Sequence, residues 1–237
     1  MKVILIKLKH VIIAISLMLT ICIIISTQKN NILTAIFNYN IEEPIRNGDT
    51  SLNKMAFTCN VDWGSEYIPK LLDILDNSNI KITFFVSGKW AQKNPELLKM
   101  MFERGHEIGN HGYSHKMHSK IEKQANYEEI KKTEDSIYEV IGIRTKLFAP
   151  PSGDYNQTTI AVASEMGYKT ILWSIDTIDW RDGSTSSIII DRVMKKSHKG
   201  AILLMHPKKA TIEALPAIIE KITGKGIQIG TVSYLLE

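Results

Sequence analysis

Cysteine is scarce in this sequence, and its two cysteines are not expected to pair. Cys22 lies in an apolar N-terminal run, and Cys59 lies in a predicted strand. A fold held together by disulfides is therefore excluded. Internal repeats and low-complexity tracts are also absent, which excludes solenoids. The 237 residues are 44% hydrophobic, enough to build one substantial core.

An excess of charge of one sign is missing as well, once the N-terminus is set apart. Three of the 29 basic residues, Lys2, Lys7 and Lys9, precede the apolar run, which leaves 26 basic residues against 25 acidic ones. Proteins that bind nucleic acid usually carry a basic excess. We therefore expect no nucleic-acid partner, and we expect a monomer.

The first 27 residues have the layout of a membrane-targeting segment. Basic residues are followed by an almost unbroken apolar run from Val11 to Ile25. No small-x-small cleavage site follows it, and Ile21 before Cys22 differs from the small residue of a bacterial lipoprotein box. We expect an uncleaved signal-anchor over residues 1–27 and an extracytoplasmic remainder. A cleaved signal peptide, and hence a secreted protein, is the alternative.

Two regions of different composition follow. Residues 28–53 are polar and rich in asparagine, which predicts a tether. From 54 to 237, apolar runs alternate with amphipathic segments. The predicted strands are 55–59, 80–86, 146–149, 168–173, 201–205 and 227–230. The predicted helices are 68–75, 95–102, 127–141, 158–166, 187–196 and 210–222. Repeated β-then-α units predict an α/β domain with a parallel sheet, open or closed into a barrel.

The most informative segment contains His111 and His115. Two histidines four residues apart share a face if the loop continues into a helical turn, so that both rings can reach one ion. Neutral imidazole is the commonest protein ligand for zinc. A catalytic zinc site usually takes three protein ligands and leaves one position open for water. A third ligand must therefore come from elsewhere.

Four further segments carry polar residues directly after predicted strands, where sites in parallel α/β folds lie. They are Thr58-Cys59-Asn60-Val61-Asp62-Trp63-Gly64, Phe148-Ala149-Pro150-Pro151-Ser152-Gly153, Trp173-Ser174-Ile175-Asp176-Thr177-Ile178-Asp179-Trp180 and Leu203-Leu204-Met205-His206-Pro207. We expect these side chains to meet the two histidines at one end of the sheet.

Together with Gly105-His106-Glu107-Ile108-Gly109-Asn110-His111, the order and spacing of these segments resemble the polysaccharide deacetylase family. This family is also called carbohydrate esterase family 4, or the NodB-homology domain. The resemblance covers about Lys54 to Leu236. It implies a distorted (β/α) barrel and a metal-dependent removal of acetyl groups from chitin-like polymers or peptidoglycan. We expect the metal to be zinc, with cobalt, nickel or manganese as alternatives.

Several residues can be given roles in such a hydrolysis. His206 is the candidate general acid for the departing amine, and Asp179 would orient its imidazole. A backbone N–H near Ser152 would complete an oxyanion hole. Trp63 and Trp180 would form a wall on which a sugar ring stacks.

The sequence departs from the family pattern at the general base. The family has two consecutive aspartates after Thr-Phe, a base and a metal ligand, and here those positions are Asn60 and Val61. The arginine that steers the base is replaced by Ala149. The two losses fit together, because an arginine without its carboxylate would be an uncompensated charge near a metal.

Asp62 offers a partial replacement. Residues two apart in an extended segment point the same way, so Asn60 and Asp62 should face the barrel mouth while Val61 faces the core. We expect Asp62 to be the third metal ligand, with the displaced base as its alternative role. If it binds metal, the base would be Asp176, Asp154 or His206.

The remaining histidines are expected outside the site. His106 precedes a predicted strand and should pack locally, His118 should be solvated, and His198 should lie at the surface.

The sequence thus predicts a membrane-anchored, extracytoplasmic deacetylase of N-acetylated cell-wall glycan. One alternative is a catalytically impaired relative that binds or organises envelope glycan. Another is a barrel metallo-hydrolase of a small amide or ester, for which a deep closed pocket would argue.

Overall fold

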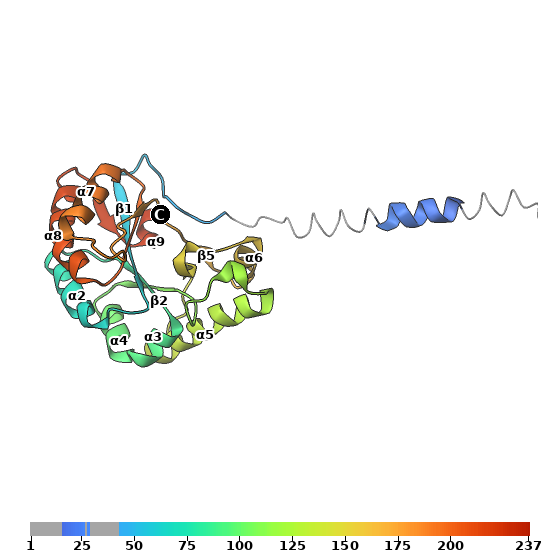
Figure 1. Ribbon diagram of the computed structural model, residues 1–237, viewed down its shortest axis with the longest axis horizontal. Coiled ribbons are helices and arrows are strands. Elements are labelled where there is room, and N and C mark those ends of the chain that lie inside the picture. The colour runs from blue at the N-terminus through green and yellow to red at the C-terminus, as the bar shows by residue number, and fades with distance from the viewer. Residues whose placement is uncertain (1–15, 27, 29–42) are drawn as a thin grey trace, which may run out of the picture. The chain divides into compact units, whose positions relative to one another are not determined.

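The computed structural model describes residues 16–26, 28 and 43–237 of the chain, which divides into two units, 1–41 and 42–237 (Figure 1). In the first unit, residues 16–26 form a helix with exposed side chains. No helix within the described residues is long and apolar enough to cross a membrane. Much of the predicted signal-anchor, and residues 29–42 of the tether, lie outside the described residues, so both stay predictions.

The larger unit is built on one curled sheet of eight strands (Figure 1). The strands are β1 (Lys54–Val61), β2 (Thr83–Val86), β3 (Glu107–Asn110), β4 (Leu147–Phe148), β5 (Lys169–Thr170), β6 (Ile175–Asp176), β7 (Ile202–Met205) and β8 (Gln228–Gly230). Their order is β5-β4-β3-β2-β1-β7-β6, with β8 also paired to β1, and the pairings are parallel. The predicted α/β class with a parallel sheet is confirmed, in the form of a curled half-barrel.

Helices cover the sheet. They are α2 (Ile68–Asn77), α3 (Gly88–Lys93), α4 (Pro95–Glu103), α5 (Lys123–Ile141), α6 (Gln157–Glu165), α7 (Ser186–Lys196), α8 (Lys209–Thr223) and α9 (Val232–Leu236). Short 3-10 turns add η1 (Ser65–Tyr67), η2 (His118–Lys120) and η3 (Pro151–Gly153). Six of the helices correspond to the predicted ranges. α3, α9 and β6 were not predicted, because segments of two to six residues are too short for a clear periodicity.

Strand β1 shows how the sheet separates its two faces. Met55, Phe57 and Val61 are fully buried in the large core between the sheet and the helices. Ala56 lies in a second, smaller core on the other face. Asn60 shares the parity of Ala56 and lines a pocket. The predicted facing of Asn60 toward the mouth and of Val61 toward the core is confirmed, because alternate side chains of a strand point to opposite faces.

Residues 43–53 run along the sheet, although their polar composition predicted part of a tether. The Ile45 N–H donates to the Thr170 carbonyl at 2.8 Å, and the Leu172 N–H donates to the Ile45 carbonyl at 2.7 Å. Further along, the Gly48 N–H donates to the Gly200 carbonyl at 2.7 Å. The segment is therefore hydrogen-bonded both to β5 and to Gly200, just before β7. Ile45 packs on the smaller core.

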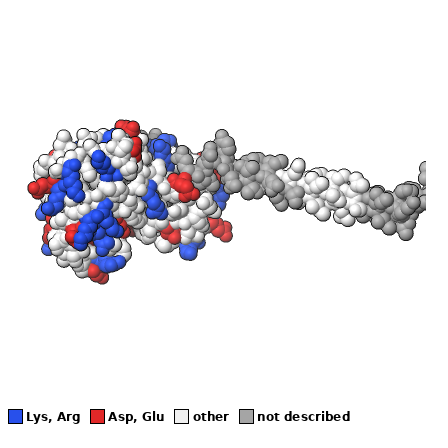
Figure 2. Space-filling model, turned by 90° about the horizontal axis from the view of Figure 1, so that it is seen from above, with Lys and Arg blue, Asp and Glu red and all other residues white. Residues whose placement is uncertain are grey.

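Figure 2 shows one face of the molecule, on which basic and acidic side chains both occur. The chemistry of the chain concentrates at the carboxyl ends of the strands.

Candidate functional site

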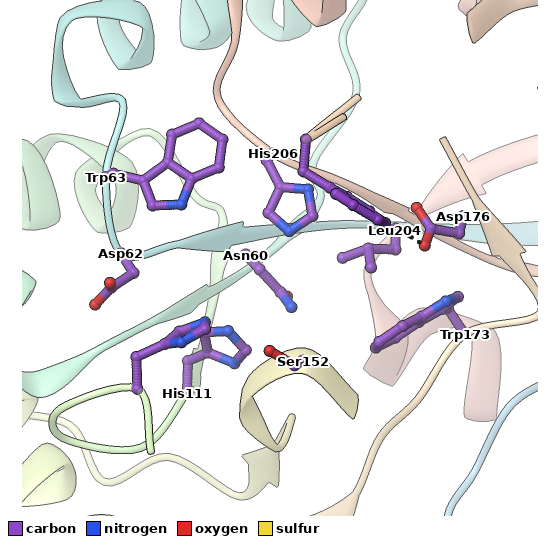
Figure 3. A pocket seen from close by; sticks show the side chains of 11 residues that line it. Asn60, Asp62, Trp63, His111, Ser152, Trp173, Asp176, Leu204 and His206 are labelled. Atoms are coloured by element: carbon purple, nitrogen blue, oxygen red, sulfur yellow. Dashed lines mark hydrogen bonds between the residues drawn. The ribbon is translucent and has the colours of Figure 1, made fainter. Parts of the chain in front are cut away.

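A cavity of about 440 Å³ lies at the carboxyl ends of the strands (Figure 3). Asn60 reaches it from β1, His111 follows β3, Asp176 ends β6, and His206 follows β7. Ser152, in the turn after β4, lines the same cavity. Because all of these strands are parallel, side chains far apart in the sequence meet at one end of the sheet.

The two histidines of the central motif lie in a loop, so the predicted helical turn is wrong. Gly112 and His115 have φ values of 69° and 54°, which are left-handed and stop a helix from forming. The Gly112 N–H instead donates to the Asn110 side chain at 2.9 Å. The loop still brings the rings together, since the centroids of His111 and His115 are 5.2 Å apart at an interplanar angle of 72°.

His111 is held as a neutral imidazole with a defined tautomer. Its Nδ1–H donates to the Ala149 carbonyl at 2.7 Å, which leaves Nε2 without a proton. Burial lowers the pKa of His111 to about 3, and the neighbouring His115 contributes to the shift. Ala149 therefore acts on His111 through its backbone carbonyl, and His111 offers a lone pair at neutral pH.

Glu129 of α5 fixes the loop that carries His115. Its carboxylate accepts hydrogen bonds from the N–H groups of Tyr113 and Ser114, at 2.9 and 2.7 Å, and from the Ser114 hydroxyl at 2.8 Å. Lys116 lies 3.2 Å from the same carboxylate. Burial opposes ionisation of Glu129, but these hydrogen bonds and Lys116 outweigh it and lower its pKa. The local sequence pattern did not predict this contact, because Glu129 lies in a later helix.

Asp62 lines the same cavity as the two histidines, but it is engaged elsewhere. Its carboxylate accepts a short hydrogen bond from the Ser87 hydroxyl at the start of α3. Across the described part of the chain, no three His, Cys, Asp or Glu side chains are arranged to hold one metal ion. The residues fit the metal of the family only in part, because His111 and His115 supply two donors and Asp62 is not placed as the third.

His206 and Asp179 form the pair that the sequence predicted. Asp179 is 1% exposed and accepts from the His206 N–H at 2.7 Å, from His206 Nδ1–H at 2.8 Å and from the Thr211 hydroxyl at 2.7 Å. Burial opposes ionisation of Asp179, but the hydrogen bonds from His206 and Thr211 outweigh it, so its pKa is lowered. An ionised Asp179 fixes the imidazole with Nε2 free to act on a ligand in the cavity.

An amide, that of Asn60, lines the cavity. Asn60 is 5% exposed and lies opposite His206 in the cavity (Figure 3). Of the three alternative bases, Asp176 and His206 line the cavity. Asp154 does not line it, and its two oxygens accept from the N–H and the hydroxyl of Ser119, both at 2.8 Å.

Aromatic rings form part of the wall. Trp63 is 39% exposed and stacks on His206 with 5.7 Å between centroids, and Trp180 is 47% exposed. Both line the cavity, as does Trp173. A Cβ on Gly153 would lie 2.6 Å from the Trp173 ring, so this turn needs glycine. Ser152 beside it has a φ of 57°.

The other histidines are outside the cavity. His106 packs locally, accepting from the Ile82 N–H, and His198 is exposed, as the sequence predicted. His118 was predicted to be solvated and is fully buried instead. Its Nδ1–H donates to Asn126 at 2.7 Å, and its ring packs on Phe148. These partners lie in other elements, which is why the local sequence did not reveal the burial.

Known proteins match this chain along most of its described length. The sequence profile of the family described as polysaccharide deacetylase matches residues 47–171. Uncharacterized protein YlxY of Bacillus subtilis is 42% identical over 82% of this chain, which covers 61% of that protein. A peptidoglycan-N-acetylglucosamine deacetylase of Bacillus cereus is 32% identical over 78% of this chain and 70% of its own length. The chain thus spans about three fifths of the length of YlxY.

Among solved structures, BA3943, described as a CE4 family pseudoenzyme from Bacillus anthracis, matches with a TM-score of 0.81. It is 35% identical to this chain, and the match covers 82% of this chain and 69% of BA3943.

Proposed function

This chain belongs to the polysaccharide deacetylase family, and we propose that it is a catalytically impaired member that binds N-acetylated envelope glycan. One observation carries the proposal: the wall of the cavity contains the amide of Asn60, at the position where the family resemblance implies a general base. An amide has no basic lone pair at neutral pH and cannot take a proton from water. The likeness to a CE4 pseudoenzyme supports the same conclusion.

The other requirements of the reaction are also incomplete. Ala149 is 3% exposed and packs in the smaller core with Phe85 and Ile171, so no cation lies at the family's arginine position. Two imidazoles remain of the three-ligand set, which zinc, cobalt, nickel or manganese would need. The hydrolysis therefore lacks a base, its steering charge and a complete ligand set.

The groups that would hold a glycan are retained. His206 offers Nε2 toward an acetamide, and Trp63 and Trp180 present exposed ring surface on which a pyranose can stack. Two neighbouring depressions, of about 740 and 590 Å³, also include Trp63 in their walls. Trp63 is thus part of the walls of three cavities. Such an extended surface suits a polymer better than a small amide or ester.

Residual deacetylation is a second candidate function, because Asp62 and Asp176 line the cavity with the intact His206–Asp179 pair. In that case one of the two carboxylates, or His206 itself, would take the proton from water. His206 would then return a proton to the amine.

The test separates binding from chemistry. We expect the full-length protein to bind chitotetraose and peptidoglycan fragments in calorimetry, and to release no acetate when zinc, cobalt, nickel or manganese is added. Trp63→Ala should weaken binding about 10-fold, which corresponds to a loss of about 1.4 kcal/mol for one stacked ring. Tyr127→Ala, an equally exposed aromatic on α5, is the matched control. Failure to bind any N-acetylated glycan rejects the proposal, and acetate release favours the second candidate.

We also propose that the N-terminal segment anchors the protein in the cell membrane and that the rest of the chain lies on the extracytoplasmic side. The apolar run in residues 11–25 follows three lysines, which favour the cytoplasmic side. Membrane fractionation followed by protease treatment of intact cells tests this placement. Recovery of the protein in the soluble cytosolic fraction would contradict it.

A further inference from the structure

A basic cavity of about 590 Å³ lies next to the central one. Asp62 and Trp63 line both, so a ligand bound at His206 can extend past Trp63 into the second space. Two lysines of α3, Lys89 and Lys93, line this second cavity together with Asn94. The roles assigned to the central cavity use neither lysine nor Asn94.

The two lysines carry charge that the protein does not neutralise. Both are exposed and lie four residues apart on α3. In the part of the chain that the structure describes, neither ammonium has a carboxylate oxygen within 4.0 Å. Asp62 is the acidic residue that lines this cavity, and its carboxylate already accepts from Ser87. The cavity therefore favours an anion.

Backbone contacts hold α3 in place against the central site. The N–H groups of Gly88 and Lys89 donate to the carbonyls of Gly112 and Tyr113, both at 3.0 Å. The Lys89 ammonium lies 6.0 Å from the Tyr113 ring centroid. The lysines are thus attached to the same loop that carries His111 and His115. These backbone hydrogen bonds therefore fix the position of α3 relative to the central cavity.

We propose that this cavity is a subsite for a carboxylate carried by the glycan beside the sugar in the central cavity. The inference rests on the proposed function and narrows it. Peptidoglycan carries carboxylates on its stem peptides, and on the lactyl group of muramic acid wherever no stem peptide is attached, whereas chitin-like polymers are neutral. The protein is therefore selective for the anionic glycan.

Three tetrasaccharides test the subsite by calorimetry with the full-length protein: chitotetraose, a peptide-free peptidoglycan tetrasaccharide, and the same compound with stem peptides. At low salt, the dissociation constant for an anionic ligand should be about 3- to 10-fold below that for chitotetraose, the range expected of two exposed ion pairs. The difference should vanish near 1 M salt, where the screening length is about 3 Å. Tight binding of the peptide-free compound assigns the lactyl carboxylate, and a preference that needs the peptides assigns the stem.

The variant Lys89→Gln/Lys93→Gln should remove this preference and leave chitotetraose binding unchanged. Lys70→Gln/Lys146→Gln removes the same charge from exposed positions outside the cavities and should keep the preference. Equal affinity of the wild type for neutral and anionic ligands overturns the inference alone. An equal loss of both affinities in the cavity variant also overturns it. Absence of binding to all three ligands overturns the proposed function as well.

Discussion

Asp179→Asn should destabilise the protein more than any other single-atom change in the site. The carboxylate is buried and accepts three hydrogen bonds, two from His206 and one from Thr211. An asparagine retains one oxygen and has an NH₂ donor in place of the other, so either the His206 backbone N–H loses its acceptor or the His206 imidazole must change its tautomer. Hydrogen bonds to a charged group contribute about 1.5–3 kcal/mol each, so we expect a loss of about 3 kcal/mol at pH 7.

The loss should depend on pH with a definite sign. Hydrogen bonds from His206 and Thr211 outweigh burial and hold the pKa of Asp179 below its ordinary value of 3.8. Because the folded pKa is the lower one, the ionised carboxylate stabilises the fold fully above about pH 4. This stabilisation disappears as the pH falls through the folded value. The wild type and Asp179→Asn should therefore converge in acid.

Urea unfolding followed by tryptophan fluorescence, at pH 7 and at successively lower pH, measures this difference. Thr211→Val is the matched control, since it removes one of the three donors and should cost about 1.5 kcal/mol, the low end for a hydrogen bond to a charged group. A change below about 0.5 kcal/mol for Asp179→Asn at pH 7 lies within the range of ordinary surface substitutions. Such a result would contradict the stabilising role assigned to the three hydrogen bonds of Asp179. A difference that is the same at pH 7 and at the acid end would refute the assigned pKa direction.

Three further predictions concern the loop, the base and the turn. Glu129→Ala leaves two N–H groups without acceptors and should cost about 3 kcal/mol, with faster amide hydrogen exchange in residues 113–116. Asn60→Asp combined with Ala149→Arg introduces the base and the arginine that the family resemblance implies, and zinc-dependent acetate release should rise at least about 100-fold above the wild-type background, the low end for general base catalysis. Gly153→Ala should weaken glycan binding and alter tryptophan fluorescence, because the new Cβ displaces an indole that lines the cavity.

Each of these has its own control. Glu128→Ala removes an exposed carboxylate from the same helix and should change stability by less than about 0.5 kcal/mol. Unchanged acetate release from the Asn60 and Ala149 variant would show that the missing third metal ligand, and not the base, limits the reaction. Gly142 also has a positive φ, but a Cβ added there would meet no atom within 4 Å. Gly142→Ala should therefore alter stability without altering glycan binding. Equal effects at Gly142 and Gly153 would exclude the contact with Trp173.

In the function proposed here, the retained residues of the cavity form a binding surface. His206, Trp63 and Trp180 need only their present positions to hold a sugar, whereas hydrolysis needs a base and a complete ligand set. With an amide at position 60, the cavity has one negative charge fewer than it would have with the aspartate that the family resemblance implies. This difference also makes the cavity less repulsive to an anionic glycan, which agrees with the two lysines beside it.

Local patterns were sufficient for part of this structure. Alternation along β1 predicted that Asn60 faces the cavity and Val61 the core, because the side-chain direction of a strand depends only on its backbone. The β-then-α order predicted a parallel sheet, and motif spacing along the chain identified the family. The amide at position 60 and the alanine at position 149 are visible directly in the sequence, and with them the doubt about catalysis.

The contacts that position the motifs, and the residues that surround them, depend on the tertiary structure. Glu129 and Asn126 reach the histidine loop from α5, so the non-helical path of that loop and the burial of His118 depend on a later helix. Ile45 joins the sheet through β5, and Lys89 and Lys93 become neighbours of Asp62 only when α3 docks on the loop. Such contacts join segments far apart in the chain, and neither hydrophobic period nor motif spacing carries information about them.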